Sequence, residues 1–175
     1  MEKVEIEGII FNLVDYSPVV ILKSAKGKVL PIVVGIFEAQ SILVAIEEAS
    51  FPRPLTHDLM KNIIVDFGWE LFRMEIYTLK KSIYYARLIL KKESEIKDID
   101  CRPSDGIALA LRFKASIFVD EALLTDIEIV KAYEGKKFIR ANKLDKPITK
   151  KEAEEFRKFI ENVSAKEFWE KLKKE

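Results

Sequence analysis

The stretch 98–105 (Asp-Ile-Asp-Cys-Arg-Pro-Ser-Asp), followed by the apolar segment 106–111, constrains the fold more than any other part of the sequence. It predicts a strand that ends at Cys101, a two-residue turn and a helix that begins at Ser104. A serine is a good N-cap because its hydroxyl can accept a hydrogen bond from a free first-turn amide. Asp105 then places a negative charge where the helix dipole is positive.

A similar arrangement occurs once more, in the segment 53–58 (Arg-Pro-Leu-Thr-His-Asp). Each copy has an Arg-Pro pair, then a Ser or Thr suited to cap a helix, then an aspartate in the first turn. Arg53 and Arg102 both precede a predicted helix start. A polar cluster that occurs twice is the one feature of this sequence that a generic globular domain would not explain.

Composition limits the classes of protein to consider. The 175 residues suffice for one domain with a proper core and a small appendage. With 49% hydrophobic and 34% charged residues, the chain is a globular protein and not a disordered one. Its net charge of +1 excludes the overall basic excess common among nucleic-acid-binding proteins, although a local basic patch remains compatible with it.

Several features favour a cytoplasmic location. Cys101 is the only cysteine, so an intrachain disulfide is excluded and a reducing compartment is expected. The N-terminal residues lack the apolar core of a signal peptide, and no run approaches the roughly 18 apolar residues of a membrane span. An abundance of Lys, Glu and Ile with little Gly also indicates a thermophile.

Apolar periodicity predicts an α+β fold, with an antiparallel or mixed sheet of short strands and helices packed on it. Gly8 suggests a bulge in the first strand, and Pro31 places its strand at an edge or at a bulge because proline has no amide to donate. Segment 92–97 is expected to be a charged, solvated loop. In all, strands are expected at 4–14, 19–22, 29–34, 69–79, 82–91, 99–101 and 116–119. Helices are expected at 35–49, 56–67 and 104–113, with a single helical turn at 121–124.

The remaining residues, 134–175, are predicted to form a C-terminal helical extension of a domain that spans 3–133. Thr149 and Ser164 each begin a capping box, so a helical hairpin or a bent helix is expected from about residue 148. This segment carries an aromatic stripe that must pack on the same chain or on a neighbouring subunit. This stripe favours a homo-oligomer, either a dimer or a larger assembly.

The doubled cluster has a structural and a functional interpretation. In the structural one, Arg53 pairs with Asp105 and Arg102 with Asp58 across a pseudo-twofold arrangement, and such arginine–carboxylate pairs hold the elements in register. In the functional one, two helix N-termini flanked by arginines bind a phosphate. His57, the only histidine, could then act as a general base or a metal ligand.

The acidic residues allow a metal-assisted version of this chemistry. Asp58, Asp100 and Asp105 could together hold a hard divalent cation, with Glu38 as a further ligand. Cleavage of a phosphodiester needs a positioned water, a base or metal to activate it, and cations around the phosphate. The spacing itself is not diagnostic of hydrolysis.

Other catalytic motifs are absent from the sequence. It has no phosphate-binding glycine loop, no Cys/His metal pattern and no nucleophilic Ser or Cys with a histidine nearby in sequence. Cys101 beside Arg102 could be a reactive thiol, but a buried cysteine at a strand end is the more common case.

Three blocks in order then resemble the bifunctional nuclease family. They are 30–39 (Leu-Pro-Ile-Val-Val-Gly-Ile-Phe-Glu-Ala), 51–59 (Phe-Pro-Arg-Pro-Leu-Thr-His-Asp-Leu) and 99–110 (Ile-Asp-Cys-Arg-Pro-Ser-Asp-Gly-Ile-Ala-Leu-Ala). The resemblance covers about residues 3 to 130. Cys101 and Gly106 stand where the family commonly has another small residue, which removes no charged group.

The resemblance implies a self-associating α+β domain with nuclease activity on both DNA and RNA. It does not supply a mechanism, so the roles come from the chemistry above. We expect His57, Asp58 and Asp105 to be catalytic; Arg53, Thr56, Arg102 and Ser104 to bind substrate; and Glu38 and Asp100 to hold Mg²⁺ or Mn²⁺. The alternative function is a non-catalytic oligomeric binding or regulatory module whose motif residues form a structural polar network.

Overall fold

The computed structural model describes residues 1–11, 17–126 and 138–140. Its strands are β1 (Glu2–Phe11), β2 (Pro18–Ser24), β3 (Val29–Val33), β4 (Glu70–Lys80), β5 (Ile83–Lys92), β6 (Glu95–Cys101), β7 (Ser116–Val119) and β8 (Phe138–Arg140). Its helices are α1 (Ile36–Ile46), α2 (Thr56–Asp66) and α3 (Pro103–Phe113), with a 3₁₀ turn, η1, at Glu121–Leu123. None of these helices is long and apolar enough to cross a membrane.

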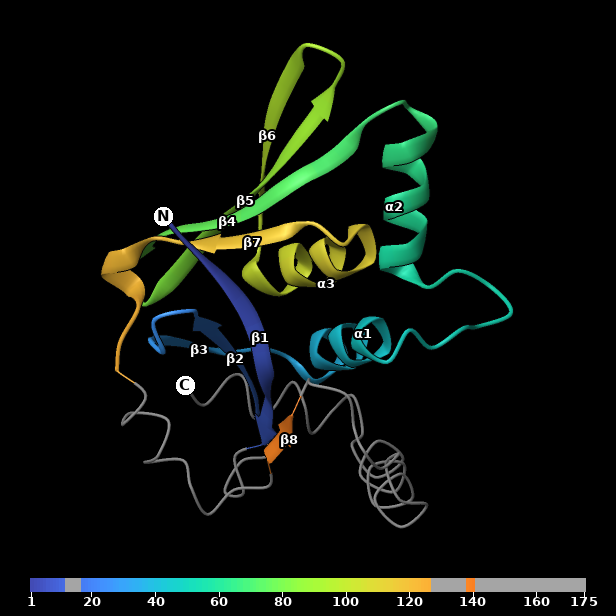
Figure 1. Cartoon of the computed structure of the whole chain (residues 1–175). Helices are drawn as coiled ribbons and strands as arrows, with labels where there is room; N and C mark the ends of the chain where they lie inside the picture. The colour runs from blue at the N-terminus through green and yellow to red at the C-terminus, as the bar shows by residue number, and fades with distance from the viewer. Residues whose placement is uncertain (12–16, 127–137, 141–175) are drawn as a thin grey trace. The chain divides into compact units, whose positions relative to one another are not determined.

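The described strands form one mixed sheet in the order β3-β2-β1-β7-β4-β5-β6, and β8 pairs with β1 (Figure 1). All neighbours are antiparallel except β4 and β7, which run parallel. This arrangement confirms the predicted α+β class. The helices predicted after residue 148 lie outside the described residues, whereas β8 lies within the predicted extension and joins the sheet.

Two residues of the first three strands act as the sequence predicts. The register of β1 against β2 shifts between Ile6 and Gly8, which is the expected bulge. β3 is an edge strand of the sheet, and it contains Pro31. An edge position tolerates proline because no partner strand needs its missing amide.

The two later hairpins differ from the prediction in detail. Lys81 and Ser82 form the tip between β4 and β5, one position later than expected, and both have positive φ, 49° and 62°. Such a pair is typical of a type I′ turn, which matches the strand twist. The expected loop at 92–97 was wrong, because β6 begins at Glu95 and pairs with β5. Charged side chains are normal on an exposed edge strand, where they deter further pairing.

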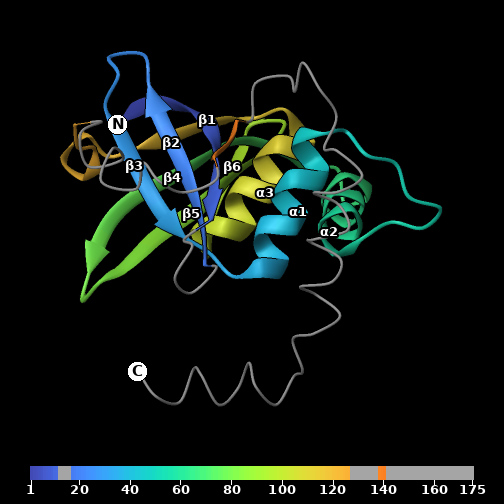
Figure 2. The same cartoon turned by 90° about the horizontal axis from the view of Figure 1, so that it is seen from below.

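Helix α3 is the centre of the core. Its middle residues are buried, and Ile107 and Leu109 have no exposed surface. It packs against β4 and β5 and contacts both α1 and α2 (Figure 2). By contrast, α2 has no buried residue, and Leu59 and Ile63 on it are 51% and 47% exposed. Helix α2 therefore depends on contacts at its edge to hold its position.

The helix starts correct the expected caps. Helix α3 begins at Pro103, with Arg102 as N-cap, and Ser104 is inside the first turn and buried. Proline suits this first helical position because its φ is already helical and it lacks the amide that would be left unpaired. Helix α2 begins at Thr56, and the Leu55 amide donates to Asp58 Oδ2 at 2.9 Å. In α2 the aspartate, not the threonine, satisfies the helix start.

Candidate active site

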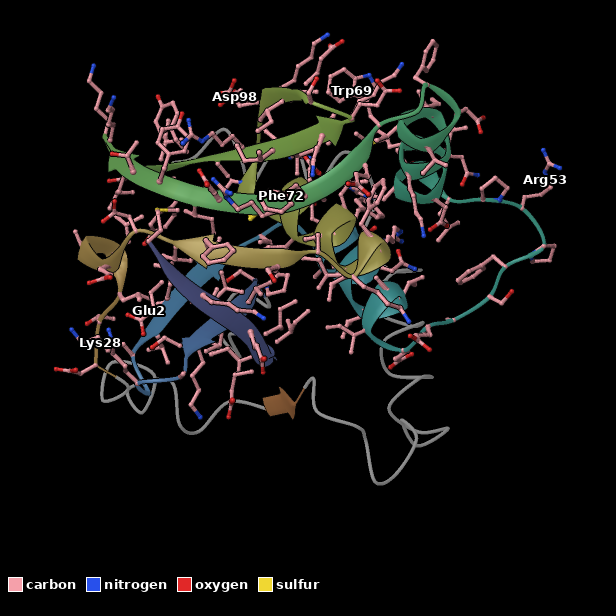
Figure 3. The ribbon with its side chains drawn as sticks, turned by 45° about the horizontal axis from the view of Figure 1, so that its top comes forward. Glu2, Lys28, Arg53, Trp69, Phe72 and Asp98 are labelled. Atoms are coloured by element: carbon pink, nitrogen blue, oxygen red, sulfur yellow. The ribbon has the colours of Figure 1, made fainter. Side chains whose placement is uncertain are left out.

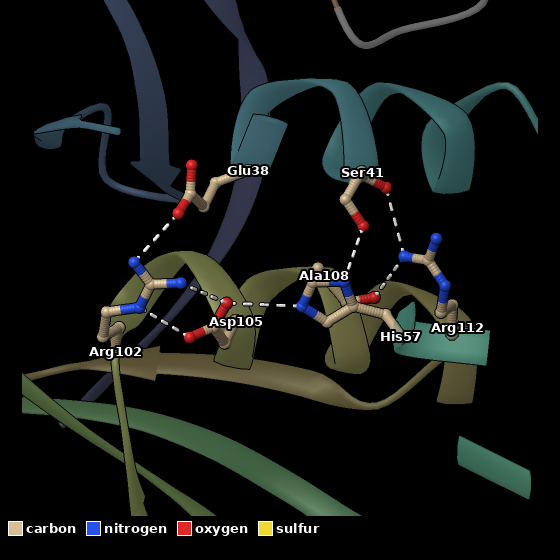
Figure 4. A network of polar contacts seen from close by, with 7 residues as sticks. All are labelled: Glu38, Ser41, His57, Arg102, Asp105, Ala108 and Arg112. Carbon is tan, nitrogen blue, oxygen red and sulfur yellow. Dashed lines mark hydrogen bonds and ion pairs between the residues drawn. The ribbon is translucent and has the colours of Figure 1, made fainter. Parts of the chain in front are cut away.

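His57 lies where the three helices meet, and it contacts the other two (Figure 4). From the second position of α2, its Nδ1 lies 2.8 Å from Ser41 Oγ on α1. Its Nε2 lies 3.3 Å from Asp105 Oδ1 on α3. The His57 side chain is only 11% exposed and that of Asp105 is 23% exposed. The imidazole is thus held on both sides at the edge of the protein interior.

The chemistry of the two partners fixes the proton on the imidazole. An ionised carboxylate can only accept hydrogen bonds, so Nε2 of a neutral His57 carries the hydrogen and donates it to Asp105. Nδ1 then has a free lone pair, which accepts from the Ser41 hydroxyl. This tautomer presents a base directly to a hydroxyl group. The three residues form a serine–histidine–aspartate chain.

Arg102 extends this chain to the protein surface. Its Nε and Nη2 donate to Asp105 Oδ2 and Oδ1 at 2.8 and 3.1 Å, and its Nη1 lies 2.9 Å from Glu38 Oε1. The hydrogen bond to Asp105 raises the pKa of Arg102, so the guanidinium keeps its charge. The Arg102 side chain is 66% exposed. It is therefore a fixed cation that solutes can reach.

Asp58 belongs to a second group of contacts, with Arg112 at the end of α3. Arg112 Nε donates to Asp58 Oδ1 at 2.6 Å. Its Nη1 donates to the carbonyls of Ser41 and Ala108 at 3.1 and 2.9 Å. Burial raises the pKa of Asp58, but the bonds from Arg112 and the Leu55 amide outweigh it and lower that pKa overall. Arg112 is 6% exposed, so this group ties the three helices together from inside.

The structure brings four of the predicted site residues together and leaves others apart. His57, Arg102, Asp105 and Glu38 form one connected cluster. Asp58 is next to His57 in sequence, but its carboxylate binds Arg112. The pairing expected across the two copies was therefore wrong, because Arg112 and not Arg102 binds Asp58, and Arg102 and not Arg53 binds Asp105.

The remaining predicted residues lie elsewhere. Arg53 is exposed on the loop between α1 and α2 and is directed away from the helices (Figure 3). Thr56 is exposed, whereas Ser104 is buried in α3. Asp100 lies on β6, opposite Arg87 of β5.

Cys101 is not a reactive thiol. Burial, followed by the charges of Asp105 and Asp100, raises the pKa of Cys101 to about 12. At neutral pH almost none of it is thiolate, which is the nucleophilic form.

The described residues do not fit the expected Mg²⁺ or Mn²⁺ site. No three His, Cys, Asp or Glu side chains among them are grouped as ligands for one ion. Glu38 and Asp105, two of the expected ligands, both bind Arg102, so a cation already neutralises them.

Sequence reasoning missed Ser41 and Arg112, which lie where the three helices meet, although the sequence held a signal for each. Ser41 is three residues after Glu38, and positions three apart share a helix face. Arg112 is seven residues after Asp105, which is two helical turns. Once Glu38 and Asp105 were candidates, the polar residues on their faces were candidates too.

Comparison with known proteins gives a consistent result. A model of the bifunctional nuclease domain matches residues 20–132, a range that contains the whole His57 cluster. An uncharacterized protein of Mycobacterium tuberculosis (strain ATCC 25618 / H37Rv) is 32% identical over 169 residues, which are 96% of this chain and 98% of that protein.

Two plant relatives carry a functional name. Bifunctional nuclease 2 of Arabidopsis thaliana is 29% identical over 143 residues, covering 77% of this chain and 41% of the plant protein. Bifunctional nuclease 1 of Oryza sativa subsp. japonica is 30% identical over 121 residues, covering 65% of this chain and 37% of its own. The chain therefore spans less than half of each plant protein.

Proposed function

This chain belongs to the bifunctional nuclease domain family, and we propose that it is a nuclease that hydrolyses phosphodiester bonds of DNA and RNA. The family match and the names of the plant relatives support the reaction class. The observation that carries the proposal is the position of His57 between a hydroxyl group and a carboxylate. This is the arrangement by which a base activates a hydroxyl nucleophile.

Ser41 is the proposed nucleophile, because its hydroxyl is the one that contacts the free nitrogen of His57. Ser41 Oγ forms a bond to phosphorus while its proton moves to His57 Nδ1. The bond from phosphorus to the leaving oxygen breaks, and His57 returns the proton to that oxygen. The intermediate is a diester in which phosphorus is bonded to Ser41 Oγ and to the remaining nucleotide. A water molecule then attacks this phosphorus and the bond to Ser41 Oγ breaks, with His57 taking the water proton and returning it to Ser41. Asp105 stabilises the imidazolium formed in each step.

Arg102 is the proposed phosphate-binding residue. A guanidinium has five N–H donors, so the bonds to Asp105 and Glu38 leave donors free for the non-bridging oxygens of a phosphate. Because Asp105 and Glu38 already fix its orientation, little further ordering is required when a phosphate binds. Asp58 is proposed to position His57 by holding the first turn of α2 against Arg112.

The test is cleavage of labelled single-stranded RNA and DNA by the purified chain, with Mg²⁺, with Mn²⁺ and with EDTA. His57→Ala is expected to reduce the rate about 10²- to 10⁴-fold, the usual contribution of a general base, and Ser41→Ala should reduce it at least as much because no nucleophile remains. Ser94→Ala, at an exposed position of the β5–β6 turn, serves as the control and should cut normally. Melting curves for all variants separate lost chemistry from lost folding.

The outcomes discriminate between the functions. Cutting that is lost in both variants, with their melting curves little changed, supports the nuclease. Equal cutting by all proteins refutes the assigned residues. If the wild type does not cut and both variants melt at lower temperature, the cluster is a structural network and the binding or regulatory module is favoured. The EDTA arm tests metal assistance separately.

Self-association and a cytoplasmic location are also part of the proposal. The exposed apolar residues of α2, among them Phe67 at its end, which is 71% exposed, are the observation that favours a homo-oligomer. Light scattering after size-exclusion chromatography measures the number of subunits directly, and a monomer at micromolar concentration would refute self-association.

A further inference from the structure

A second charged group lies on the sheet, apart from the His57 cluster. Glu75 of β4 is 4% exposed and is bound by two arginines. Arg73 Nε lies 2.6 Å from Glu75 Oε1, and Arg87 Nε lies 2.8 Å from Oε2. Its neighbours Met74 and Ile76 are fully buried in the core with α3. Because side chains alternate along a strand, Glu75 points to the opposite face of the sheet.

The two arginines are only partly used by this carboxylate. Each binds Glu75 through Nε, and within the described residues no hydrogen bond or ion pair engages an Nη atom of Arg73. Arg87 Nη1 is 3.4 Å from Asp98, whose side chain is 65% exposed. The side chains of Arg73 and Arg87 are 36% and 39% exposed. Their outer N–H groups can therefore reach a solute.

The arrangement gives the sheet two guanidinium groups in fixed positions. Burial raises the pKa of Glu75, but the bonds from Arg73 and Arg87 lower it overall, so the carboxylate stays ionised. Burying an ion pair seldom yields much net stability, because desolvation offsets the attraction. With Asp98 beside Arg87 the four side chains carry no net charge, so what the buried carboxylate provides is orientation: it holds two guanidinium groups side by side with outer N–H donors at the surface.

Aromatic rings flank both guanidinium groups. The centre of the Arg73 guanidinium is 5.2 Å from the Phe72 ring, and that of Arg87 is 5.1 Å from the Tyr77 ring. The Tyr77 and Tyr85 rings are 6.4 Å apart and tilted by 55°. Phe72 is 52% exposed and Tyr85 is 36% exposed. The surface thus alternates flat rings with fixed cations.

We propose that this surface binds single-stranded nucleic acid, with the arginines on phosphates and the exposed rings against bases. Proteins that bind single strands combine cations along the backbone with aromatic rings on which bases stack. An acidic peptide would satisfy the arginines but would leave the exposed rings without a partner. We call this surface the arginine–aromatic face; it consists of Phe72, Arg73, Glu75, Tyr77, Tyr85 and Arg87.

The inference builds on the proposed nuclease function, because it supplies a substrate-binding surface separate from the bond-breaking residues. Helix α3, which carries Asp105, packs on the other face of β4 and β5 (Figure 1). A single-stranded nucleic acid bound to the arginine–aromatic face is therefore tethered there, which raises the local concentration of substrate around the protein. Binding and cutting are then separable, and each can be lost without the other.

The test is fluorescence anisotropy with labelled single-stranded oligonucleotides in EDTA, at several salt concentrations, using the His57→Ala background to prevent cutting. Replacing Arg73, Glu75 and Arg87 together by Gln removes the cations without leaving an unpaired buried carboxylate. Lys28→Gln is the matched control, since it changes the net charge equally at the β2–β3 turn, away from Phe72 (Figure 3). Melting curves verify that both variants fold.

The triple variant is expected to bind about tenfold more weakly at ~0.1 M salt, and to lose about 1.4 from the slope of log K against log salt, since each phosphate contact on a single strand contributes about 0.7. Tyr85→Ala should weaken binding several-fold while leaving that slope unchanged, because stacking releases no ions. The proposal would be overturned if the folded triple variant bound as tightly as its parent, or if Lys28→Gln lost as much affinity. Absence of binding by the parent, or equal competition by poly-glutamate, would also overturn it. Binding by the wild type without any cutting would refute the proposed function of the His57 cluster alone and leave the binding surface supported.

Discussion

Replacing Arg112 with methionine should release α2 from the rest of the domain. Arg112 is 6% exposed and donates to the Asp58 carboxylate and to the carbonyls of Ser41 and Ala108. Those bonds join α3 to both other helices, whereas α2 buries no residue of its own. Methionine matches the arginine stem as far as Nε, so it keeps the packing of the stem and removes the guanidinium group with its polar contacts.

The magnitude follows from these contacts. A hydrogen bond to a charged group contributes about 1.5–3 kcal/mol, and each bond to a carbonyl about 1 kcal/mol. Two effects offset part of this loss. Arg112 Nη2 is buried without a partner in the described residues, and methionine removes that unsatisfied donor. Asp58 is 36% exposed, so water can solvate it again. We expect a net loss of about 2–4 kcal/mol, or a melting temperature lower by roughly 5–15 °C for a chain of this size.

Urea unfolding of the wild type, Arg112→Met, Asp58→Asn and the double variant isolates the pair in a double-mutant cycle. The pKa of Asp58 is lowered from 3.8 in the folded state, so its contribution is present above pH 3.8 and is lost as the pH falls through the folded-state pKa. The difference between the wild type and Arg112→Met should therefore shrink in acid to the part contributed by the two carbonyl bonds. Lys114→Met is the control, because the Lys114–Glu48 pair is 83% and 77% exposed and should contribute little. A loss below about 0.5 kcal/mol for Arg112→Met, or one independent of pH, would refute the reasoning.

Three further predictions concern other buried groups. Gly106→Ala should lower the urea midpoint, because a Cβ there would lie 2.8 Å from Met74 Cε and 3.1 Å from Cys101 Sγ, although alanine favours the helix by about 1 kcal/mol; a raised midpoint would show that Met74 moves aside. Glu75→Gln should destabilise the protein above pH 4.5, with a difference that vanishes in acid because the pKa of Glu75 is lowered on folding; a constant difference in pH-dependent unfolding would contradict this. Cys101 should react with iodoacetamide at pH 8 far more slowly than a free thiol, because its pKa is about 12; rapid alkylation of the folded protein would contradict it.

The parts of the fold that local chemistry dictates could be predicted from the sequence. Gly8 gives the bulge and Pro31 the edge strand because backbone restrictions act within a few residues. Gly68, with φ of +77°, ends α2 for the same reason. The loop expected at 92–97 was wrong because its charges were taken to exclude a strand. An edge strand such as β6 tolerates them on both faces.

The candidate site was harder to predict because its contacts join distant parts of the chain. His57 and Asp105 were both expected at helix starts, but neither start reveals which side chain lies opposite the imidazole. The serine beside His57 is in the middle of another helix, where no capping or turn rule selects it. Arg112 lies in α3, and the apolar sequence of this helix predicts a buried element of the core. Only the packing of α3 between α1 and α2 makes both residues polar neighbours of the site.

The two halves of the sheet are joined by short pairings. β7 pairs three residues with β1 on one side and four residues with β4 on the other, and among the described strands it is the one that connects β3-β2-β1 to β4-β5-β6. Each half can form its hairpins early, because their partners are close in sequence. Joining the halves requires residues 116–119, which the ribosome makes after both. During synthesis the edges of both halves therefore stay unpaired until β7 has been made. Aggregation through these exposed edges is most favoured in that interval.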